Sequence, residues 1–337
     1  MQAPWAGVPD AYRQLPVGRF SLPGNAADWI RERESVSSIV IGSLGDRPPR
    51  PPIPAVRTVW RKQARGFTIE KFTFQNCVDS VVPGYIAIPL GITKPGPAVL
   101  AIHGHGGSKE GIFGRISSQQ NVAERLAARG FVVMAIDNYF SGERRGSGPD
   151  GPNASPSTEE SSLFKLNLWL GRTLWGMMLR DQQMALDYLV SRPEVDPARI
   201  GTQGMSMGST AAWWLAAIDE RVKAVVGAAC FTRYQDLIAT RGLPQHGIYY
   251  YVPGLLRAFD TEGVMSLIAP RPFLAMTGDR DAGSPPKGVR TLEEVLSRCY
   301  ALYGKPDRFN SVILPNTGHV YSELMKQKML AWFELFL

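Results

Sequence analysis

A short glycine-flanked motif between an apolar strand and an apolar helix restricts the folds open to this chain more than any other feature. Residues 204–208 read Gly-Met-Ser-Met-Gly, after the strand-like run 199–203 and before the helix-like run 209–215. A serine on such a turn has a strained backbone and a hydroxyl that projects above the sheet edge, and the flanking glycines avoid clashes that a Cβ would make. The motif therefore predicts a nucleophile elbow at Ser206 and acyl transfer to water.

Short apolar runs alternate with helix-period segments over most of the chain, which is typical of parallel strands covered on both faces. The pattern predicts an α/β protein whose open, mostly parallel sheet has about eight strands with helices on both faces. An antiparallel hairpin, 67–77 with 81–91, leads into this sheet. The remaining strands are expected at 98–102, 131–136, 199–202, 222–227, 273–276 and 311–314, and the helices at 116–129, 171–191, 207–218 and 287–303.

The segment before the hairpin has a different composition. Residues 1–66 are rich in Pro and Arg, and the run 48–54 favours an extended polyproline conformation over a helix. We expect this segment to form a strap packed on a catalytic domain of residues 67–337; an SH3-type ligand is the other interpretation. The stretches 138–170 and 231–268 interrupt the alternation, and insertions of this length predict cap elements over the site.

Composition excludes several classes of protein. With 44% hydrophobic and 20% charged residues the chain resembles an ordinary soluble enzyme and is not expected to be disordered. The 37 Lys and Arg against 30 Asp and Glu are scattered and carry no aromatic stacking pattern, so no nucleic-acid partner is predicted. Cys77, Cys230 and Cys299 lie far apart and form no CxxC pair, which argues against a disulfide framework or a zinc site.

Targeting signals are also missing from the sequence. No run of about 18 apolar residues suggests a membrane span. Residues 1–5, Met-Gln-Ala-Pro-Trp, lack the charged-then-apolar layout of a signal peptide. The sequence therefore predicts a cytoplasmic protein, although an exported form with its signal removed would look the same.

A serine nucleophile needs a base, and the base needs an acid that holds its tautomer. His319 follows the expected strand 311–314, which places it on the same rim as Ser206. Asp279 and Asp281 both follow the strand at 273–276; Asp281 is the expected acid, because its greater distance from the strand lets it reach His319. The chain order Ser, Asp, His is that of α/β-hydrolases.

Attack by the serine creates an oxyanion, which requires N–H donors already aimed at it. One donor is expected from the residue after the nucleophile, Met207. The second is expected from the loop after the strand 98–102, where Gly104 and Gly106 allow the backbone to approach the substrate. We assign it to the N–H of His105.

The same loop offers a competing interpretation, because His103 and His105 could together ligate zinc. No Asp or third His follows at metal-ligand spacing, so no metal is predicted. His103 is instead expected to support the loop through hydrogen bonds of its ring.

Four further residues are candidates for contact with substrate. Glu143 and Arg144 follow the strand 131–136 and could bind a polar substrate, with a local salt-bridged turn as the alternative. Trp175 and Tyr250 could line a pocket, with a place in the core as their alternative.

With these residues in place, the chain resembles the α/β-hydrolase superfamily, and within it the prokaryotic acetyl-xylan-esterase-like and dienelactone-hydrolase-like proteins. The resemblance covers roughly residue 30 onward. Its marks beyond Ser206, Asp281 and His319 are the loop 103–107, the segment 180–196, the run Ile-Ala-Pro-Arg-Pro at 268–272 and the acid-loop spacing from Gly278 to Pro285.

The resemblance implies an α/β-hydrolase fold and removal of small acyl groups, often acetyl, from sugars or small alcohols without a cofactor. Dienelactone hydrolases use a cysteine where this chain has Ser206. We therefore expect a serine carboxylic-ester hydrolase that acts through an acyl-enzyme on a small-molecule, short-chain ester. The alternatives are a peptidase or amidase of the same fold, and a catalytically silent binding protein, since a fold alone does not determine function.

Overall fold

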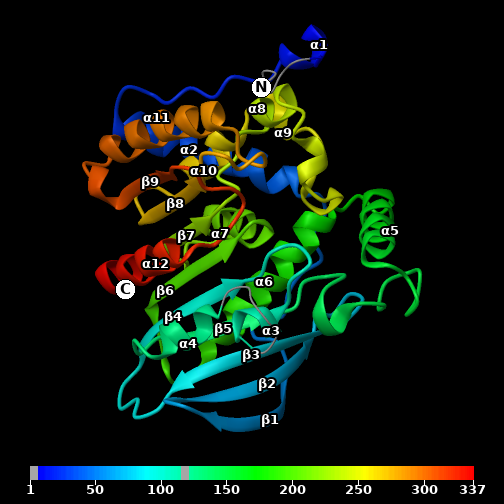
Figure 1. Cartoon of the computed structure of the whole chain (residues 1–337), viewed down its shortest axis with the longest axis vertical. Helices are drawn as coiled ribbons and strands as arrows, with labels where there is room; N and C mark the ends of the chain where they lie inside the picture. Colours follow the sequence, from blue (N-terminus) through cyan, green and yellow to red (C-terminus); the bar gives the residue numbers. More distant parts are fainter. Residues whose placement is uncertain (1–6, 115–120) are drawn as a thin grey trace.

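The computed structural model describes residues 7–114 and 121–337. In these residues one nine-stranded sheet runs through the molecule in the order β1-β2-β3-β5-β4-β6-β7-β8-β9 (Figure 1). The strands are β1 (Val56–Ala64), β2 (Phe67–Gln75), β3 (Val81–Pro89), β4 (Gly96–Ile102), β5 (Val132–Ile136), β6 (Val195–Met205), β7 (Ala224–Ala228), β8 (Phe273–Gly278) and β9 (Phe309–Leu314).

The sheet is parallel from β5 to β9 and antiparallel at the other edge. Neighbouring strands run parallel in the pairs β5–β4, β4–β6, β6–β7, β7–β8 and β8–β9. The pairs β1–β2, β2–β3 and β3–β5 are antiparallel. The expectation of an α/β protein with a mostly parallel sheet and a leading hairpin is confirmed. The expected count of strands was low by one, because β1 lies in the segment that we expected to be a strap.

Helices cover both faces of the sheet because successive strand residues point to opposite sides. Leu100 belongs to the core cluster that includes residues of α2, α6, α7, α10 and α11, whereas its neighbours Val99 and Ala101 belong to the cluster that includes residues of α3, α4 and α12. The bounds are α2 (Ala26–Ser43), α3 (Lys109–Ile112), α4 (Val122–Ala127), α6 (Leu174–Ser191), α7 (Met207–Ile218), α10 (Thr261–Ser266), α11 (Pro286–Leu302) and α12 (Glu323–Phe336); α1 (Asp10–Arg13) and η4 (Pro306–Arg308) are short. No helix in the described parts of the chain combines the length and apolarity needed to cross a membrane.

The N-terminal segment is more structured than a strap. Residues 26–43 form the helix α2, which begins at Asn25, whose side chain accepts a hydrogen bond from the N–H of Asp28. Trp29 of this helix is 0% exposed and belongs to the main core. The run 48–54 is non-helical as predicted, and the guanidinium of Arg180 in α6 donates to the carbonyl oxygens of Pro48 and Pro49 at 2.7 and 2.6 Å.

Residues 1–6 of the expected N-terminal strap and residues 116–120 of the expected helix 116–129 lie outside the described residues. Of the expected helix 116–129, α4 is the described part. The domain boundary expected at 66/67 falls inside the β1–β2 hairpin, where Ala64 pairs with Phe67. Residues before this boundary therefore contribute a strand to the same sheet.

The two insertions follow β5 and β7. The first contains η1 (Gly142–Arg144) and α5 (Pro156–Trp169); the second contains α8 (Tyr234–Ala239), η2 (Leu243–Gln245), η3 (Ile248–Tyr250), α9 (Leu255–Ala258) and α10. α5 stands at the side of the molecule (Figure 1), and its Glu160 contacts the backbone of η3. The insertions therefore touch one another, and their role as a cap stays a prediction.

Candidate active site

The site is formed by residues that directly follow neighbouring parallel strands. The carboxyl ends of such strands meet at one edge of the sheet. Ser206 follows β6, Cys230 follows β7, Asp281 follows β8 and His319 follows β9, while the loop from His103 follows β4. Residues far apart in sequence thus reach one rim.

Ser206 has the strained backbone expected of an elbow, with φ 60° and ψ −123°. Its N–H donates to the carbonyl oxygen of Ala228 at 2.9 Å, which ties the turn to β7. A Cβ on Gly204 would lie 2.2 Å from the backbone of Gly208, and one on Gly208 would lie 2.0 Å from the carbonyl oxygen of Ile102. Both glycines are therefore required by close backbone contacts.

The structure brings the three residues of the predicted triad together. Ser206 Oγ lies 2.8 Å from His319 Nε2, and His319 Nδ1 lies 2.9 Å from Asp281 Oδ2. Asp281 is 3% exposed, and its other oxygen accepts the N–H of Gly283 at 2.9 Å. Asp279 instead accepts the N–H of Thr317 at 3.1 Å, which stabilises the loop. The carboxylate that contacts His319 is therefore that of Asp281.

The hydrogen bond to Asp281 raises the pKa of His319, and the negative charge of Asp281 adds to this rise. Partial burial of the ring acts in the opposite direction. Because Nδ1–H is held by the carboxylate, Nε2 of the neutral ring is free to accept the serine proton. The chain of contacts can therefore activate a hydroxyl nucleophile.

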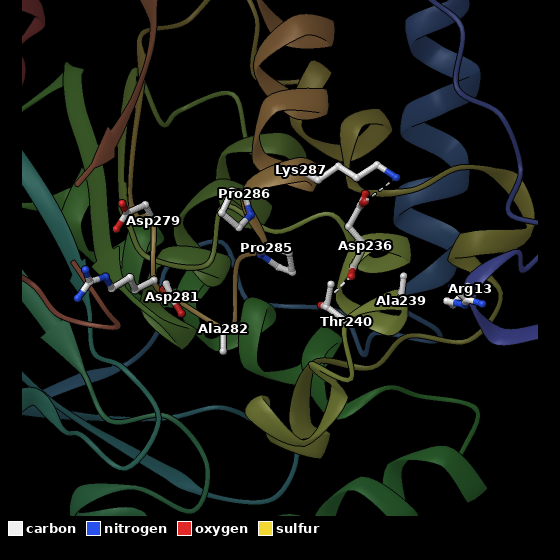
Figure 2. Close-up of a pocket in the computed structure, with 11 residues that line it drawn as sticks. Arg13, Asp236, Ala239, Thr240, Asp279, Asp281, Ala282, Pro285, Pro286 and Lys287 are labelled. Carbon is white, nitrogen blue, oxygen red and sulfur yellow. Dashed lines mark hydrogen bonds and ion pairs between the residues drawn. The ribbon is translucent and has the colours of Figure 1, made fainter. Parts of the chain in front are cut away.

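A cavity of about 670 Å³ adjoins the acid loop (Figure 2). Asp281 is at one side, and Asp236 and Thr240 of the α8 segment are on the other. The described residues that line it are Arg13, Asp236, Ala239, Thr240, residues 279–282 and residues 285–287, and this set includes neither Ser206 nor His319. The cavity thus lies behind the acid loop, away from the nucleophile.

The residues expected to supply the oxyanion donors lie beside the elbow. Met207 is the first residue of α7. A Cβ on Gly104 would lie 3.1 Å from the carbonyl oxygen of Met205, so this glycine lets the loop pass close to the elbow. Gly106 has a φ of 71°, a conformation that favours glycine. His105 lies between them. The role of the N–H groups of Met207 and His105 stays a prediction.

His103 is buried at the base of this loop, and both of its ring nitrogens have protein partners. Nδ1 lies 2.8 Å from the carbonyl oxygen of Gly104, and Nε2 accepts the N–H of Asn138 at 3.1 Å. Burial lowers the pKa of His103, which keeps the ring neutral and matches one donor with one acceptor. Across residues 7–114 and 121–337, no group of three His, Cys, Asp or Glu side chains gathers as a metal site would.

Glu143 and Arg144 lie in a network of ion pairs. The carboxylate of Glu143 contacts Lys109 Nζ and Lys71 Nζ, each at 2.6 Å. Arg144 is 1% exposed and donates to Asp181 at 2.8 Å. The prediction that Arg144 contacts substrate is thus corrected, because its guanidinium is buried against protein partners. Both residues form ion pairs, but their partners lie elsewhere in the chain and not in the local turn that was the alternative.

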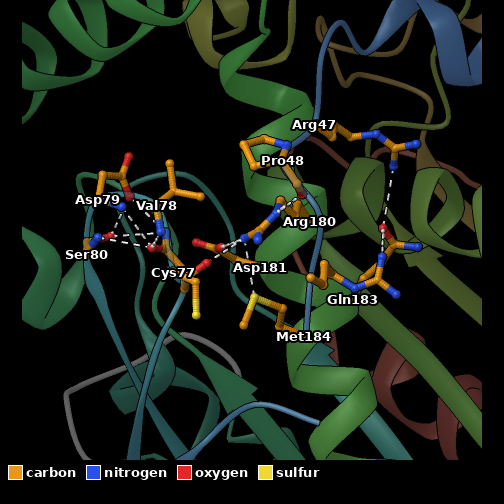
Figure 3. A network of polar contacts seen from close by, with 12 residues as sticks. Arg47, Pro48, Cys77, Val78, Asp79, Ser80, Arg180, Asp181, Gln183 and Met184 are labelled. Atoms are coloured by element: carbon orange, nitrogen blue, oxygen red, sulfur yellow. Dashed lines mark hydrogen bonds and ion pairs between the residues drawn. The ribbon is translucent and has the colours of Figure 1, made fainter. Parts of the chain in front are cut away.

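Asp181, the partner of Arg144, lies beside Arg180, the residue that binds the carbonyl oxygens of Pro48 and Pro49. Figure 3 shows it next to Arg180, whose guanidinium reaches Pro48, on the side of α6 that faces the turn of residues 77–80. The buried guanidinium of Arg180 holds the N-terminal segment and the β2–β3 turn to α6, because it also donates to the carbonyl oxygen of Asn76.

Trp175 and Tyr250 are both buried in the main core. Tyr249 contacts both, with its ring centroid 5.7 Å from that of Trp175 and 5.6 Å from that of Tyr250, and it also stacks on His105. Direct contact of Trp175 or Tyr250 with a substrate would require their neighbours to move. Their core alternative agrees with this burial.

Two features of the site were missed by sequence reasoning. Cys230 lies with Sγ 4.0 Å from Ser206 Oγ, and burial raises the pKa of its thiol to about 12. Its only sequence signal was its position just after the strand 222–227. The second feature is Glu160, whose carboxylate lies 2.7 Å from His105 Nε2, a pairing across 55 positions that no spacing indicates.

An open α/β sheet with a serine on a strained strand-to-helix turn, followed along the rim by a carboxylate and a histidine, is the arrangement that defines an α/β-hydrolase. The chain belongs to the Abhydrolase family, whose profile matches residues 14–319. The expectations of an α/β-hydrolase fold and of a hydrolase are confirmed.

Comparison with known proteins agrees with this family. The chain is 36% identical over 300 residues to "Putative hydrolase YtaP" of Bacillus subtilis, covering 87% of this chain and 96% of the relative. It is 23% identical over 269 residues to "Putative carboxymethylenebutenolidase" of Yersinia pestis, covering 75% and 83%.

Solved structures show the same fold. One is described as "a putative acetyl xylan esterase" from Bacteroides fragilis, with TM-score 0.74 and 20% identity over 90% of this chain and 80% of that one. Another is a glucuronoyl esterase from Solibacter usitatus, with TM-score 0.72 and 19% identity over 95% and 99%.

Proposed function

We propose that this chain is a serine carboxylic-ester hydrolase that acts through an acyl-enzyme. The observation that carries the proposal is the hydrogen-bonded series Ser206, His319 and Asp281, with distances of 2.8 and 2.9 Å, on a strained elbow. The hydroxyl oxygen, the two ring nitrogens and the carboxylate oxygen are within hydrogen-bonding distance of one another in the order that acyl transfer requires.

The cycle begins when His319 Nε2 takes the proton of Ser206 Oγ as this oxygen attacks the ester carbonyl carbon. The N–H groups of Met207 and His105 hold the oxyanion of the tetrahedral intermediate. His319 then gives the proton to the departing alcohol oxygen. Water then attacks the acyl carbon as His319 Nε2 takes its proton, the bond from that carbon to Ser206 Oγ breaks, and the histidine returns the proton to Oγ as the acid leaves. Asp281 keeps the ring oriented throughout.

Two considerations favour a short acyl group on a sugar or small alcohol. Cys230 Sγ lies 4.0 Å from Ser206 Oγ, so a buried side chain adjoins the nucleophile on that side. One solved structure of similar fold is described as "a putative acetyl xylan esterase", and an acetyl ester of a sugar is consistent with that likeness.

A peptidase of the same fold would need a free charged group to bind a peptide terminus. Glu160 is the carboxylate of the first insertion that reaches the loop of His105, and its oxygens contact His105 Nε2 and the N–H of Tyr249. Because this carboxylate already has partners, the ester is the better supported substrate.

Replacement of the nucleophile tests the proposal. We expect Ser206→Ala to lose roughly a thousandfold or more of kcat for p-nitrophenyl acetate, and to lose labelling by a fluorophosphonate probe. Ser38→Ala, an exposed serine on α2, is the matched control and should keep both. Parental rates in Ser206→Ala would refute the mechanism.

The acyl group is tested with p-nitrophenyl esters of increasing chain length beside acetylated sugars. A steep fall in kcat/KM beyond short chains is expected. A preference for long acyl chains, or faster cleavage of aminoacyl-nitroanilides than of esters, would overturn the substrate assignment.

A further inference from the structure

The imidazole of His105 has no part in the cycle above, which uses only the backbone N–H of that residue. Its side chain is 45% exposed, so it remains accessible at the site. The ring is nevertheless held in place, because it stacks on Tyr249 with centroids 5.3 Å apart and planes 21° from parallel. A fixed, accessible ring one residue from Gly104, which approaches the nucleophile, is placed to meet substrate.

Glu160 determines which nitrogen of this ring carries the proton. Its Oε2 lies 2.7 Å from Nε2 of His105, and its Oε1 accepts the N–H of Tyr249 at 3.2 Å. An ionised carboxylate only accepts hydrogen bonds, so Nε2 of His105 must be the donor. In the neutral ring Nδ1 is then an acceptor, and it has no partner among the residues that the structure describes.

The surroundings of His105 connect it with the opposite side of the site. Behind its ring, Tyr249 contacts Tyr250, and Tyr250 lies 5.0 Å from the ring of His246, centroid to centroid. His246 Nε2 is 3.1 Å from the carbonyl oxygen of Gly283 in the acid loop. These rings form a continuous wall from the loop of His105 to the loop of Asp281, and the position of His105 in it is the exposed one.

We propose that the imidazole of His105, fixed by Glu160 and Tyr249, accepts a hydrogen bond from a hydroxyl group of the substrate and so selects esters of hydroxylated alcohols over esters of apolar alcohols. The proposal rests on the ester hydrolysis proposed above. His105 is the specificity-determining residue, and Glu160 is a positioning residue that acts through it.

A ring that merely supports the backbone at residue 105 would behave differently. Loss of such support would disturb the oxyanion donor, which every ester needs, and all esters would slow together through kcat. Loss of a contact with a substrate hydroxyl would affect only substrates that have the hydroxyl. The ratio of two substrates therefore distinguishes the two roles.

The experiment uses two acetate esters with a six-membered ring, methyl 6-O-acetyl-glucoside and cyclohexylmethyl acetate, which differ in the ring oxygen, methoxy group and hydroxyls. We expect the parent to prefer the glucoside in kcat/KM. His105→Phe keeps a stacked ring without its nitrogens and should lower this preference by about tenfold, mainly through KM. Glu160→Gln, which preserves volume, should lower it in the same direction by a smaller factor and serves if His105→Phe fails to fold.

Trp169→Ala is the matched control, because Trp169 lies on the same helix as Glu160 and is 89% exposed. Its substrate ratio should equal that of the parent. The proposal is overturned if the parent shows no preference for the glucoside, or if the ratio in both variants stays within about twofold of the parental one. Activity of Ser206→Ala on both esters would instead refute the proposed function.

Discussion

His319 and Asp281 meet across 38 positions of the chain, with Nδ1 of the ring 2.9 Å from Oδ2 of the carboxylate. The two residues follow the neighbouring strands β9 and β8. The carboxylate is buried while the ring is half exposed, so this hydrogen-bonded pair is shielded from solvent at the carboxylate and accessible at the ring.

The pH dependence of activity follows from this contact. The hydrogen bond to Asp281 raises the pKa of His319 from its ordinary value of 6.5, and the base works only when neutral. We expect kcat/KM for p-nitrophenyl acetate to fall as the pH drops through a midpoint above 6.5. In Asp281→Asn the charge is lost, so this midpoint should move to lower pH while the maximal rate falls. A midpoint that stays in place or rises would contradict the assignment.

The two aspartates of the acid loop should respond very differently to substitution. Asp281→Asn is expected to lower kcat roughly a thousandfold or more, because the ring loses its orienting acid. Asp279→Asn removes a charge but keeps an oxygen that can accept the N–H of Thr317, and it should cost less than about tenfold. Steady-state rates of both variants, with thermal melting to show that each is folded, make the comparison. Equal losses would mean that the loop, and not the acid, was damaged.

Cys230 should resist alkylation although it lies beside the nucleophile. Burial raises the pKa of its thiol to about 12, so the reactive thiolate is scarce at neutral pH. Treatment with iodoacetamide is expected to label the exposed Cys77 and to leave esterase activity intact. Peptide mass analysis beside the activity assay, with Cys77→Ser as control, checks this. Loss of activity in step with modification of Cys230 would show that its thiol is reactive.

The N-terminal helix should contribute to global stability. Trp29 is 0% exposed, and its ring packs edge-to-face on Phe20. We expect Trp29→Ala to lower the free energy of unfolding by about 3–5 kcal/mol, because a large cavity remains. Its neighbour Ile30 is exposed, so Ile30→Ala should change stability little. Guanidinium denaturation measures both. A similar small effect for the two variants would mean that α2 packs loosely.

The sheet could be predicted from sequence because its parallel strands are buried on both faces and so appear as short apolar runs. The helix α2 could not, since it buries only Trp29 and Val40 and leaves Ile30, Ile39 and Ile41 exposed. Its apolar residues therefore do not mark one face, and the nearby prolines suggested an extended segment instead.

The positions of Ser206, Asp281 and His319 were predictable because parallel strands align their carboxyl ends. The partners of the insertions were not, since a contact such as Glu160 with His105 depends on how two irregular segments pack. Arg144 shows the same limit: an arginine in a polar loop suggests an exposed side chain, and only the fold shows that Asp181 receives it in the interior.

The position of Glu160 has a consequence for engineering the specificity of this enzyme. The carboxylate of Glu160, which lies on the helix of the first insertion, contacts Tyr249 of the second insertion and His105 of the loop, so it links the three segments. A chimera that receives only one insertion from a relative would break these contacts and leave a buried polar side chain without a partner. Transplanting both insertions together with the loop is the design that preserves these contacts.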